Sequence, residues 1–251
     1  MRSASLACLA TSSCADEDRA VYQGLVEQMD LEIESLLNGM DPAVLDDTIV
    51  VFFGDNGTPS QVEEGSFDVT PARGKGTTYE NGVRVPLIVA DGGTWRTGAA
   101  GAITSPNRTV DAGVHVLDLY QTLHNHALAV SVAFVDSSSF VDCFTRTGRY
   151  CGFPSRRYGY AESYRTTPNL SADVAVHYGY DKMVAWYDPA QGCMQAEYYN
   201  TRSDRLETRP KSWATRRRGT RLQDHFASLH ASDPTSWAID PATGAPFTFC
   251  P

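Results

Sequence analysis

The feature that most constrains the fold of this chain is a short apolar run that ends abruptly at a polar turn. The run is Ile49-Val50-Val51-Phe52-Phe53, and Gly54-Asp55-Asn56-Gly57 follows it directly. A strand without polar alternation is typical of a parallel sheet that is covered on both faces. We therefore expect a buried strand whose carboxyl end carries the side chains of Asp55 and Asn56.

A helix is expected before this strand. Apolar residues recur at helical spacing from residue 21 to residue 40, Asp16 or Asp18 can cap the start, and Gly39 ends the pattern. A helix, a short acidic connection and a buried strand make half of a right-handed crossover unit. The sequence therefore predicts an α/β fold built on a mostly parallel sheet with flanking helices. Residues 110–116 are a further candidate strand, and Asp118 can cap a second helix.

The second half of the chain has a different pattern. Four short segments are rich in aromatic and β-branched residues, namely 158–165, 174–178, 182–187 and 196–199. Several short strands at this spacing predict a small antiparallel sheet. The domain organisation that we expect is a disordered leader over 1–15, an α/β core over 16–130, an antiparallel subdomain over 131–204 and a poorly specified tail over 205–251.

Composition and charge exclude some classes of function. The chain has 251 residues, 42% of them hydrophobic, and a formal net charge of −9, which argues against a nucleic-acid partner. The one basic cluster, Arg216-Arg217-Arg218 with Lys211 and Arg221, lies in a polar tract and is typical of a solvated tail. No apolar run approaches the length of a membrane span.

Cysteine usage leaves the compartment open. The six cysteines form no C-x-x-C pair and have no histidine at zinc spacing, so a zinc site is not expected. Cys143 and Cys151 bracket a short loop and either form a disulfide, which implies an oxidising compartment, or remain buried thiols. Residues 1–15 are a poor match to a secretory signal because their apolar core is weak.

The candidate functional residues follow the apolar strand. An isolated Asp-Asn-Gly is usually turn chemistry, but ligands of open α/β sheets bind outside the carboxyl ends of the strands. Asp55 and Asn56 offer hard oxygen donors of the kind that bind Ca²⁺ or Mg²⁺. Lys75 lies between two glycines, and its compact charge suits an oxyanion. A Walker A loop is excluded because Val69 stands where its first glycine is required.

These motifs resemble those of the sulfatases of the alkaline-phosphatase superfamily, and arylsulfatase A-like members in particular. The resemblance rests on G-D-N-G over 54–57 and on K-G-T-T-Y-E-N-G over 75–82, and it extends with less specific matches over roughly residues 18–205. It implies an alkaline-phosphatase-like sheet followed by a small antiparallel subdomain. It also implies that Asp55 and Asn56 bind a divalent cation, usually calcium, and that Lys75 contacts the sulfate as a catalytic residue.

The resemblance further implies a formylglycine nucleophile, made from Cys or Ser in a C/S-x-P-S-R motif that the bound metal activates. In the family this motif lies upstream of the D-N-G turn, and the residues before Asp16 do not contain it. The stretch Cys151-Gly152-Phe153-Pro154-Ser155-Arg156 has one residue too many between Cys and Pro and falls after the metal motif. We therefore expect the formylglycine in an N-terminal part outside this chain, with an N-terminal complementing fragment as a candidate partner.

The expected function is metal-dependent hydrolysis of a sulfate ester, in a small molecule or a sulfated glycan, with this chain carrying part of the active site. One alternative is a phosphate or phosphonate ester hydrolase of the same superfamily. Another is a truncated remnant without catalytic activity. The resemblance favours a periplasmic or secreted location.

Overall fold

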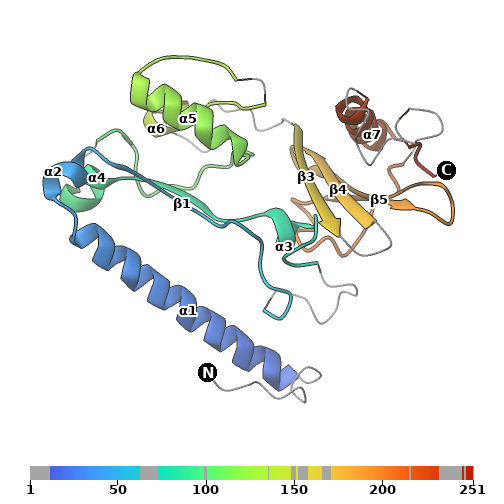
Figure 1. Ribbon diagram of the computed structural model, residues 1–251, viewed down its shortest axis with the longest axis horizontal. Coiled ribbons are helices and arrows are strands. Elements are labelled where there is room, and N and C mark those ends of the chain that lie inside the picture. The colour runs from blue at the N-terminus through green and yellow to red at the C-terminus, as the bar shows by residue number, and fades with distance from the viewer. Residues whose placement is uncertain are drawn as a thin grey trace.

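Two antiparallel sheets organise the chain (Figure 1). In the computed structural model of this protein the described residues are 12–62, 73–98, 101–134, 136–147, 151, 158–165, 171–214, 216–231, 245 and 247–250. One sheet has the strand order β1-β2 and the other has the order β3-β4-β5-β6. The α/β class and the antiparallel C-terminal sheet that the sequence predicts are both confirmed.

The apolar run forms strand β1 (Ile49–Phe53), and it pairs with β2 (Leu87–Asp91). The pairing is antiparallel, from Ile49 opposite Asp91 to Phe53 opposite Leu87. The parallel pairing expected for this strand is therefore wrong within the described residues. A parallel partner needs a crossover connection, usually a long helix, whereas the helix among the described residues between β1 and β2 is the four-residue α3 (Glu80–Val83). The two strands are half-covered rather than buried, and Phe53 is 43% exposed.

Helix α1 (Ser12–Asn38) begins before the expected caps at Asp16 or Asp18 and ends, as predicted, just before Gly39. It extends along one side of the molecule (Figure 1), and many of its apolar side chains are exposed. Helices α2 (Pro42–Asp46) and α4 (Gly92–Thr97) lie at the end of the first sheet where β1 begins and β2 ends. No described helix combines the length and the apolar character that a membrane crossing requires.

Helix α5 (Leu117–Leu128) and the short α6 (Asp142–Thr145) lie beside the first sheet. Asp118 lies within the first turn of α5, where its buried carboxylate accepts hydrogen bonds from the backbone N–H groups of His115 and Ser138. The candidate strand over 110–116 is not formed, and this segment has irregular structure. A small core around Phe140 and Phe144 joins these elements to the side chains of β2.

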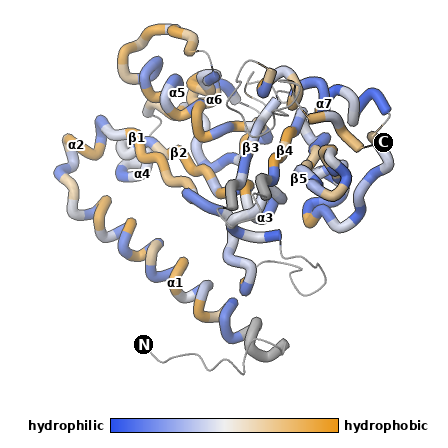
Figure 2. The backbone as a smooth tube through the Cα atoms, turned by 45° about the vertical axis from the view of Figure 1, so that its right-hand side comes forward, coloured by the Kyte–Doolittle hydropathy of each residue, from blue (hydrophilic) through white to orange (hydrophobic). Residues whose placement is uncertain are grey.

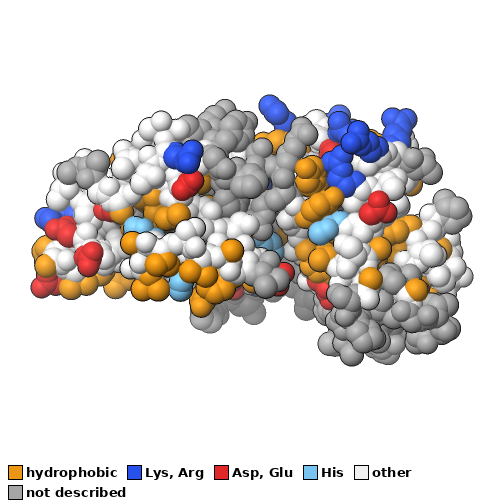
Figure 3. Space-filling view, turned by 90° about the horizontal axis from the view of Figure 1, so that it is seen from above, with side chains coloured by type: hydrophobic (Ala, Val, Ile, Leu, Met, Phe, Trp, Pro, Cys, Tyr) orange, Lys and Arg blue, Asp and Glu red, His pale blue; other side chains and the backbone are white. Residues whose placement is uncertain are grey.

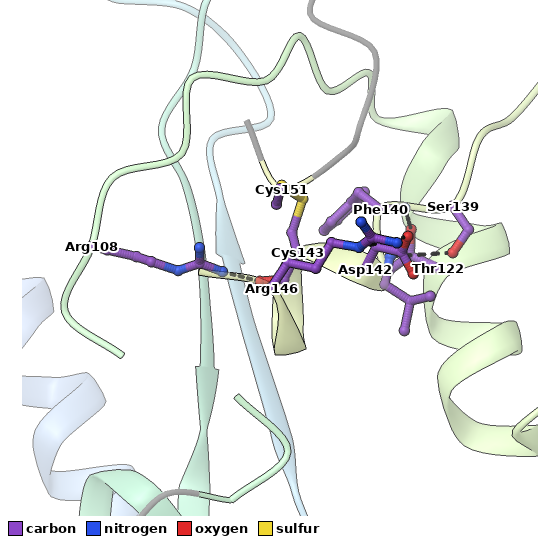
Figure 4. The surroundings of a disulfide bond; sticks show 9 residues. Arg108, Thr122, Ser139, Phe140, Asp142, Cys143, Arg146 and Cys151 are labelled. Carbon is purple, nitrogen blue, oxygen red and sulfur yellow. Dashed lines mark hydrogen bonds and ion pairs between the residues drawn. A yellow bond between two sulfur atoms is a disulfide. The ribbon is translucent and has the colours of Figure 1, made fainter. Parts of the chain in front are cut away.

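A disulfide between Cys143 and Cys151 closes the loop after α6, which settles the alternative that the sequence leaves open (Figure 4). The guanidinium of Arg108 donates a hydrogen bond to the carbonyl oxygen of Cys143. A second disulfide joins Cys193 to Cys250, so it fixes the end of the chain to the edge of the C-terminal sheet.

The four predicted strands of the second half are all present. They are β3 (Tyr158–Arg165), β4 (Ser171–Tyr178), β5 (Asp181–Asp188) and β6 (Cys193–Asn200). Side chains alternate between two faces of this sheet, as the period of a strand requires. One face packs Val174, Val176 and Met183 against helix α7 (Arg217–His230), and the other face packs Ala175, Val184 and Tyr199 against Tyr79.

Helix α7 was not predicted. Its sequence is rich in basic residues and shows no obvious apolar period. The interpretation of the basic cluster as a solvated tail is wrong for residues 217–230, because they form this helix. Leu222 and Phe226 are fully buried against the sheet, so the helix is part of the folded subdomain.

Candidate active site

Asp55 and Asn56 lie at the carboxyl end of β1, as predicted, with both side chains exposed to solvent. The turn that carries them is held by backbone hydrogen bonds on both sides. The N–H of Gly54 donates to Pro86 O (3.2 Å), and the N–H of Gly57 donates to Gly82 O (3.0 Å). The two oxygen-bearing side chains therefore project from a fixed backbone.

Glycine is required where this turn meets the loop that carries Lys75. A Cβ on Gly57 would lie 2.1 Å from the carbonyl oxygen of Asn81, and a Cβ on Gly82 would lie 2.2 Å from that of Thr77. Real Cβ atoms do not approach other atoms this closely. A larger residue at Gly57 therefore forces the two loops apart, and one at Gly82 distorts the Lys75 loop itself. The glycines of both sequence motifs thus serve a close approach of backbones.

The loop with Lys75 is joined to the Asp55 turn by its own backbone. The N–H of Lys75 donates to the carbonyl oxygen of Thr58 at 2.7 Å, and the N–H of Thr58 donates to Asn81 O at 2.8 Å. Gly76 has a φ of 86°, a left-handed conformation that favours glycine. The side chain of Lys75 is exposed. The structure therefore brings together the three residues that the sequence singles out, because their backbones share one hydrogen-bonded unit.

Two residues that follow Lys75 anchor this loop to the C-terminal sheet, a role that the sequence did not reveal. The hydroxyl of Tyr79 donates to Glu197 Oε2 (2.7 Å), as does that of Tyr199 (2.5 Å). Arg73 lies 3.7 Å from the same carboxylate, and its guanidinium stacks 4.3 Å from the centre of the Tyr79 ring. Burial is the main cause that raises the pKa of Tyr79 well above its usual range, and the hydrogen bond to Glu197 adds to the increase. The hydroxyl therefore remains protonated and keeps donating.

The second anchor is a buried ion cluster at the start of helix α3 (Glu80–Val83). Lys182 Nζ lies 3.0 Å from Glu80 Oε1 and 3.0 Å from Glu207 Oε1, and the backbone N–H of Glu80 donates to Glu207 Oε2 at 2.6 Å. Lys182 and Glu207 are each 1% exposed. Burial raises the pKa of Glu207 even though the ammonium of Lys182 opposes that shift. The only sequence signal for this cluster was Lys182, a charged residue directly before the apolar part of strand β5.

Asp55 and Asn56 fit part of a hard-cation site. The two residues are consecutive in the chain, their side chains are exposed, and their oxygens suit Ca²⁺ or Mg²⁺, which take six or more oxygen ligands. Within the described part of the chain, no three or more His, Cys, Asp or Glu side chains gather closely enough to hold a metal. By themselves Asp55 and Asn56 supply only part of the ligand set that such a cation takes.

The cysteine nearest in sequence to a formylglycine motif is engaged elsewhere. Cys151 is bonded to Cys143, so its sulfur is unavailable for conversion or for nucleophilic attack (Figure 4). The C-G-F-P-S-R stretch therefore supplies no free cysteine for a formylglycine.

Comparison with known sequences points to one family. The sulfatase family model matches residues 7–129, which contain the Asp55 turn and the Lys75 loop. A sulfatase from Formosa agariphila is 34% identical over 115 residues, an alignment that covers 42% of this chain and 19% of the relative.

Solved structures share the fold at low sequence identity. A sulfatase structure from Bacteroides thetaiotaomicron superposes with a TM-score of 0.62 at 16% identity, over 90% of this chain and 44% of its own. A structure in complex with its substrate D-glucosamine-2-N,6-O-disulfate superposes with a TM-score of 0.56 at 17% identity, over 82% of this chain and 38% of its own. This chain thus spans less than half the length of these relatives. Residues 7–129, which carry the two motif loops, thus match the sulfatase family in sequence, and the chain shares the alkaline-phosphatase-like fold of the solved sulfatase structures.

Proposed function

We propose that this chain takes part in the metal-dependent hydrolysis of a sulfate ester and carries part of the active site. The observation that carries the proposal is the 2.7 Å hydrogen bond from the N–H of Lys75 to Thr58 O. It joins the loop of the exposed ammonium to the turn of the exposed Asp55 and Asn56 side chains. An ammonium beside hard oxygen ligands is an arrangement that suits a sulfate group held between a cation and a lysine.

Asp55 and Asn56 are the proposed ligands of a divalent cation, with Ca²⁺ favoured and Mg²⁺ as the smaller alternative. When bound, such a cation polarises the sulfate and favours the ionised form of a nucleophile. Lys75 is the proposed catalytic residue: its ammonium binds a sulfate oxygen and offsets the negative charge that develops on the leaving oxygen. The anchors at Tyr79 and Glu80 support this role because they fix the Lys75 loop to the C-terminal sheet.

The nucleophile is proposed to be a formylglycine in an N-terminal segment outside these 251 residues, either joined to them or acting as a complementing fragment. The Cys143–Cys151 disulfide supports this proposal because it removes the only stretch here that approximates the motif. The two disulfides also support an oxidising compartment, and hence a periplasmic or secreted location.

The proposed substrate is a sulfated glycan. The support is the structural neighbour whose substrate is D-glucosamine-2-N,6-O-disulfate, a sulfated amino sugar. Small aryl sulfates serve as reporters of the same chemistry. A phosphate or phosphonate ester remains the alternative substrate class, and a non-catalytic remnant remains the alternative to an enzyme.

The test is turnover by this chain combined with an N-terminal sulfatase segment that contains formylglycine. An aryl sulfate should be hydrolysed much faster than the matching aryl phosphate, and chelation of divalent cations should abolish turnover. Lys75→Ala should lower kcat by at least about a hundredfold, as the loss of an oxyanion-stabilising group does. Asp55→Asn should lower the affinity for Ca²⁺, measured by calorimetry.

Lys211→Ala and Asp30→Asn are the matched controls, because each alters a residue of the same type away from the two loops. Both should leave kcat and Ca²⁺ affinity unchanged. Preference for the aryl phosphate would favour the phosphatase alternative. Absence of both turnover and Ca²⁺ binding in a folded assembly would favour the remnant.

A further inference from the structure

An open pocket with several polar and charged side chains lies on the face of the C-terminal sheet that α7 covers. Its volume is about 480 Å³, and its lining consists of Tyr158 of β3 together with residues 217, 220, 221, 224, 225 and 228 of α7. The Lys75 loop packs on the opposite face of the same sheet, through Tyr79 and Lys182. The sheet therefore separates this pocket from the candidate active site.

The pocket is built on a rigid support. Its lining residues recur at three- and four-residue spacing along one side of α7, while Leu222 and Phe226 anchor the other side with no exposed surface. The ring of Tyr158 stacks on that of His225, with centroids 3.7 Å apart and an angle of 16° between the planes. The guanidinium of Arg221 lies 4.7 Å from the centre of the Tyr178 ring. The aromatic wall and the guanidinium of Arg221 are thus held in place before any ligand arrives.

The charge of this pocket is unusual for its position. Arg216, Arg217 and Arg218 stand at the start of α7, where the helix macrodipole disfavours cations. Arg218 pairs with Asp181 at 3.0 Å, but neither Arg217 nor Arg221 forms an ion pair within the described part of the chain. Lys and Arg side chains gather over this region of the surface (Figure 3). A bound anion would relieve both the mutual repulsion of the arginines and their conflict with the helix dipole.

We propose that this pocket binds an anionic sugar, specifically a sulfated oligosaccharide, at a site distinct from the catalytic loops. Arg217 and Arg221 supply planar guanidinium groups that can each make two hydrogen bonds to a sulfate group. Asp224, which also lines the pocket, repels a bare anion but accepts hydrogen bonds from sugar hydroxyl or amide groups. A ligand that carries a sulfate group beside hydroxyl groups can bind the arginines with the first and donate hydrogen bonds to Asp224 with the second.

The size of the pocket agrees with this ligand, since a volume of about 480 Å³ lies in the range of small-molecule sites. The hydroxyls of Thr220 and Ser228 line the same wall and add donor and acceptor groups for a sugar ring. The choice of a sulfated sugar over other anionic sugars rests on the proposed function, whereas the anion site itself does not. Two sites on one chain would hold a polymeric substrate near the active site through effective concentration.

The experiment measures direct binding without turnover. The complete chain is titrated with a heparin-derived hexasaccharide, with a desulfated hexasaccharide of the same length and with inorganic sulfate, by calorimetry at two salt concentrations. We expect binding of the sulfated hexasaccharide that weakens as salt rises, and much weaker binding of the other two probes. Arg217→Ala and Arg221→Ala should each weaken binding about tenfold, the effect of losing one charged hydrogen-bonding group.

Arg202→Ala is the matched control, because it removes an exposed arginine that stacks on Tyr180 outside the pocket. It should leave the affinity unchanged. The titration measures binding without turnover, so a failure of the proposed catalytic function does not alter this result. Asp224→Asn should weaken the binding of the hexasaccharide but strengthen the binding of inorganic sulfate. Circular dichroism confirms that each variant retains its fold.

Three outcomes would overturn the proposal. The first is equal binding of the sulfated and desulfated sugars, and the second is an equal loss of affinity in Arg202→Ala and Arg217→Ala. The third is tighter binding of a single-stranded oligonucleotide of matched charge, which would identify a nucleic-acid surface instead.

Discussion

Gly57 lies where the two loops of the candidate active site touch. Replacing it with alanine would place a Cβ 2.1 Å from Asn81 O and 2.5 Å from Gly82 Cα, so the loops must separate. We expect Gly57→Ala to cost about 1–3 kcal/mol of stability, the usual effect of overpacking. We also expect a larger fractional loss of Ca²⁺ affinity and turnover, because Asp55 and Lys75 no longer share a fixed backbone.

Gly113→Ala is the control for this substitution, since a Cβ at that position meets no atom within 4 Å. Urea denaturation reports stability, and calorimetry with Ca²⁺ reports the site. If Gly57→Ala binds Ca²⁺ as well as Gly113→Ala does, the close approach of the loops does not organise the site.

Lys182 is the buried cation that holds the carboxylates of Glu80 and Glu207. Lys182→Met leaves the buried carboxylate of Glu207 without its cation and leaves Glu80 with only the longer contact to Arg84 (3.9 Å). This should destabilise the chain by about 3–5 kcal/mol near neutral pH. Burial already raises the pKa of Glu207 above its ordinary value of 4.5. Its contribution to stability is thus greatest below pH 4.5 and declines as the pH rises through the raised pKa.

The deficit of Lys182→Met should therefore shrink as the pH falls, because Glu207 takes up a proton and no longer needs the cation. Urea denaturation of both proteins at pH 7.5 and at about pH 5 measures this difference. Lys211→Met, which removes a lysine outside the cluster, should show no such dependence. A Lys182→Met deficit that is equal at both pH values would contradict the assigned ion cluster.

At the scale of whole elements, α7 shows why a polar sequence can still form a docked helix. Only Gly219, Leu222, Phe226 and His230 of its residues are buried, so the apolar signal is too sparse to stand out among the arginines. The four positions recur every three or four residues and therefore share one face. The sheet beneath them supplies the apolar partner that the helix itself lacks.

Phe226→Ala tests this docking. Phe226 has no exposed surface and packs against the core of the C-terminal sheet, so its truncation should cost about 3–5 kcal/mol. Leu229→Ala, at a side chain that is 40% exposed on the same helix, should cost much less. Guanidinium denaturation followed by circular dichroism measures both. Similar losses in the two variants would mean that α7 is not fixed by its apolar face.

At the scale of the whole molecule, a large apolar surface remains uncovered. Leu25 and Leu36 of α1 are 65% and 67% exposed, Ile88 of β2 is 57% exposed and Tyr120 of α5 is 64% exposed. Figure 2 shows hydrophobic positions along α1, β1 and β2. Surfaces of this kind favour association with other chains or with further polypeptide.

We therefore expect the 251-residue chain to self-associate when it is purified alone, and Leu25→Glu with Leu36→Glu to reduce that association. Sedimentation velocity over a concentration series provides the measurement. Glu17→Gln, an exposed polar change on the same helix, is the control. A wild-type chain that stays monomeric at every concentration would contradict this expectation.

The sequence by itself determined many of the local elements and singled out Asp55, Asn56 and Lys75 as the candidate site. The run before Asp55, the glycines around Lys75 and the alternating strands of the second half all act over a few residues, so pattern alone predicted them. The tertiary structure alone decided the antiparallel partner of β1, the docking of α7 and the burial of Lys182. Each depends on groups far apart in the chain: Lys182 meets Glu80 and Glu207 only after the C-terminal sheet packs on the loop after Lys75. Such contacts have no short-range signature, because their free energy comes from partners that only folding brings together.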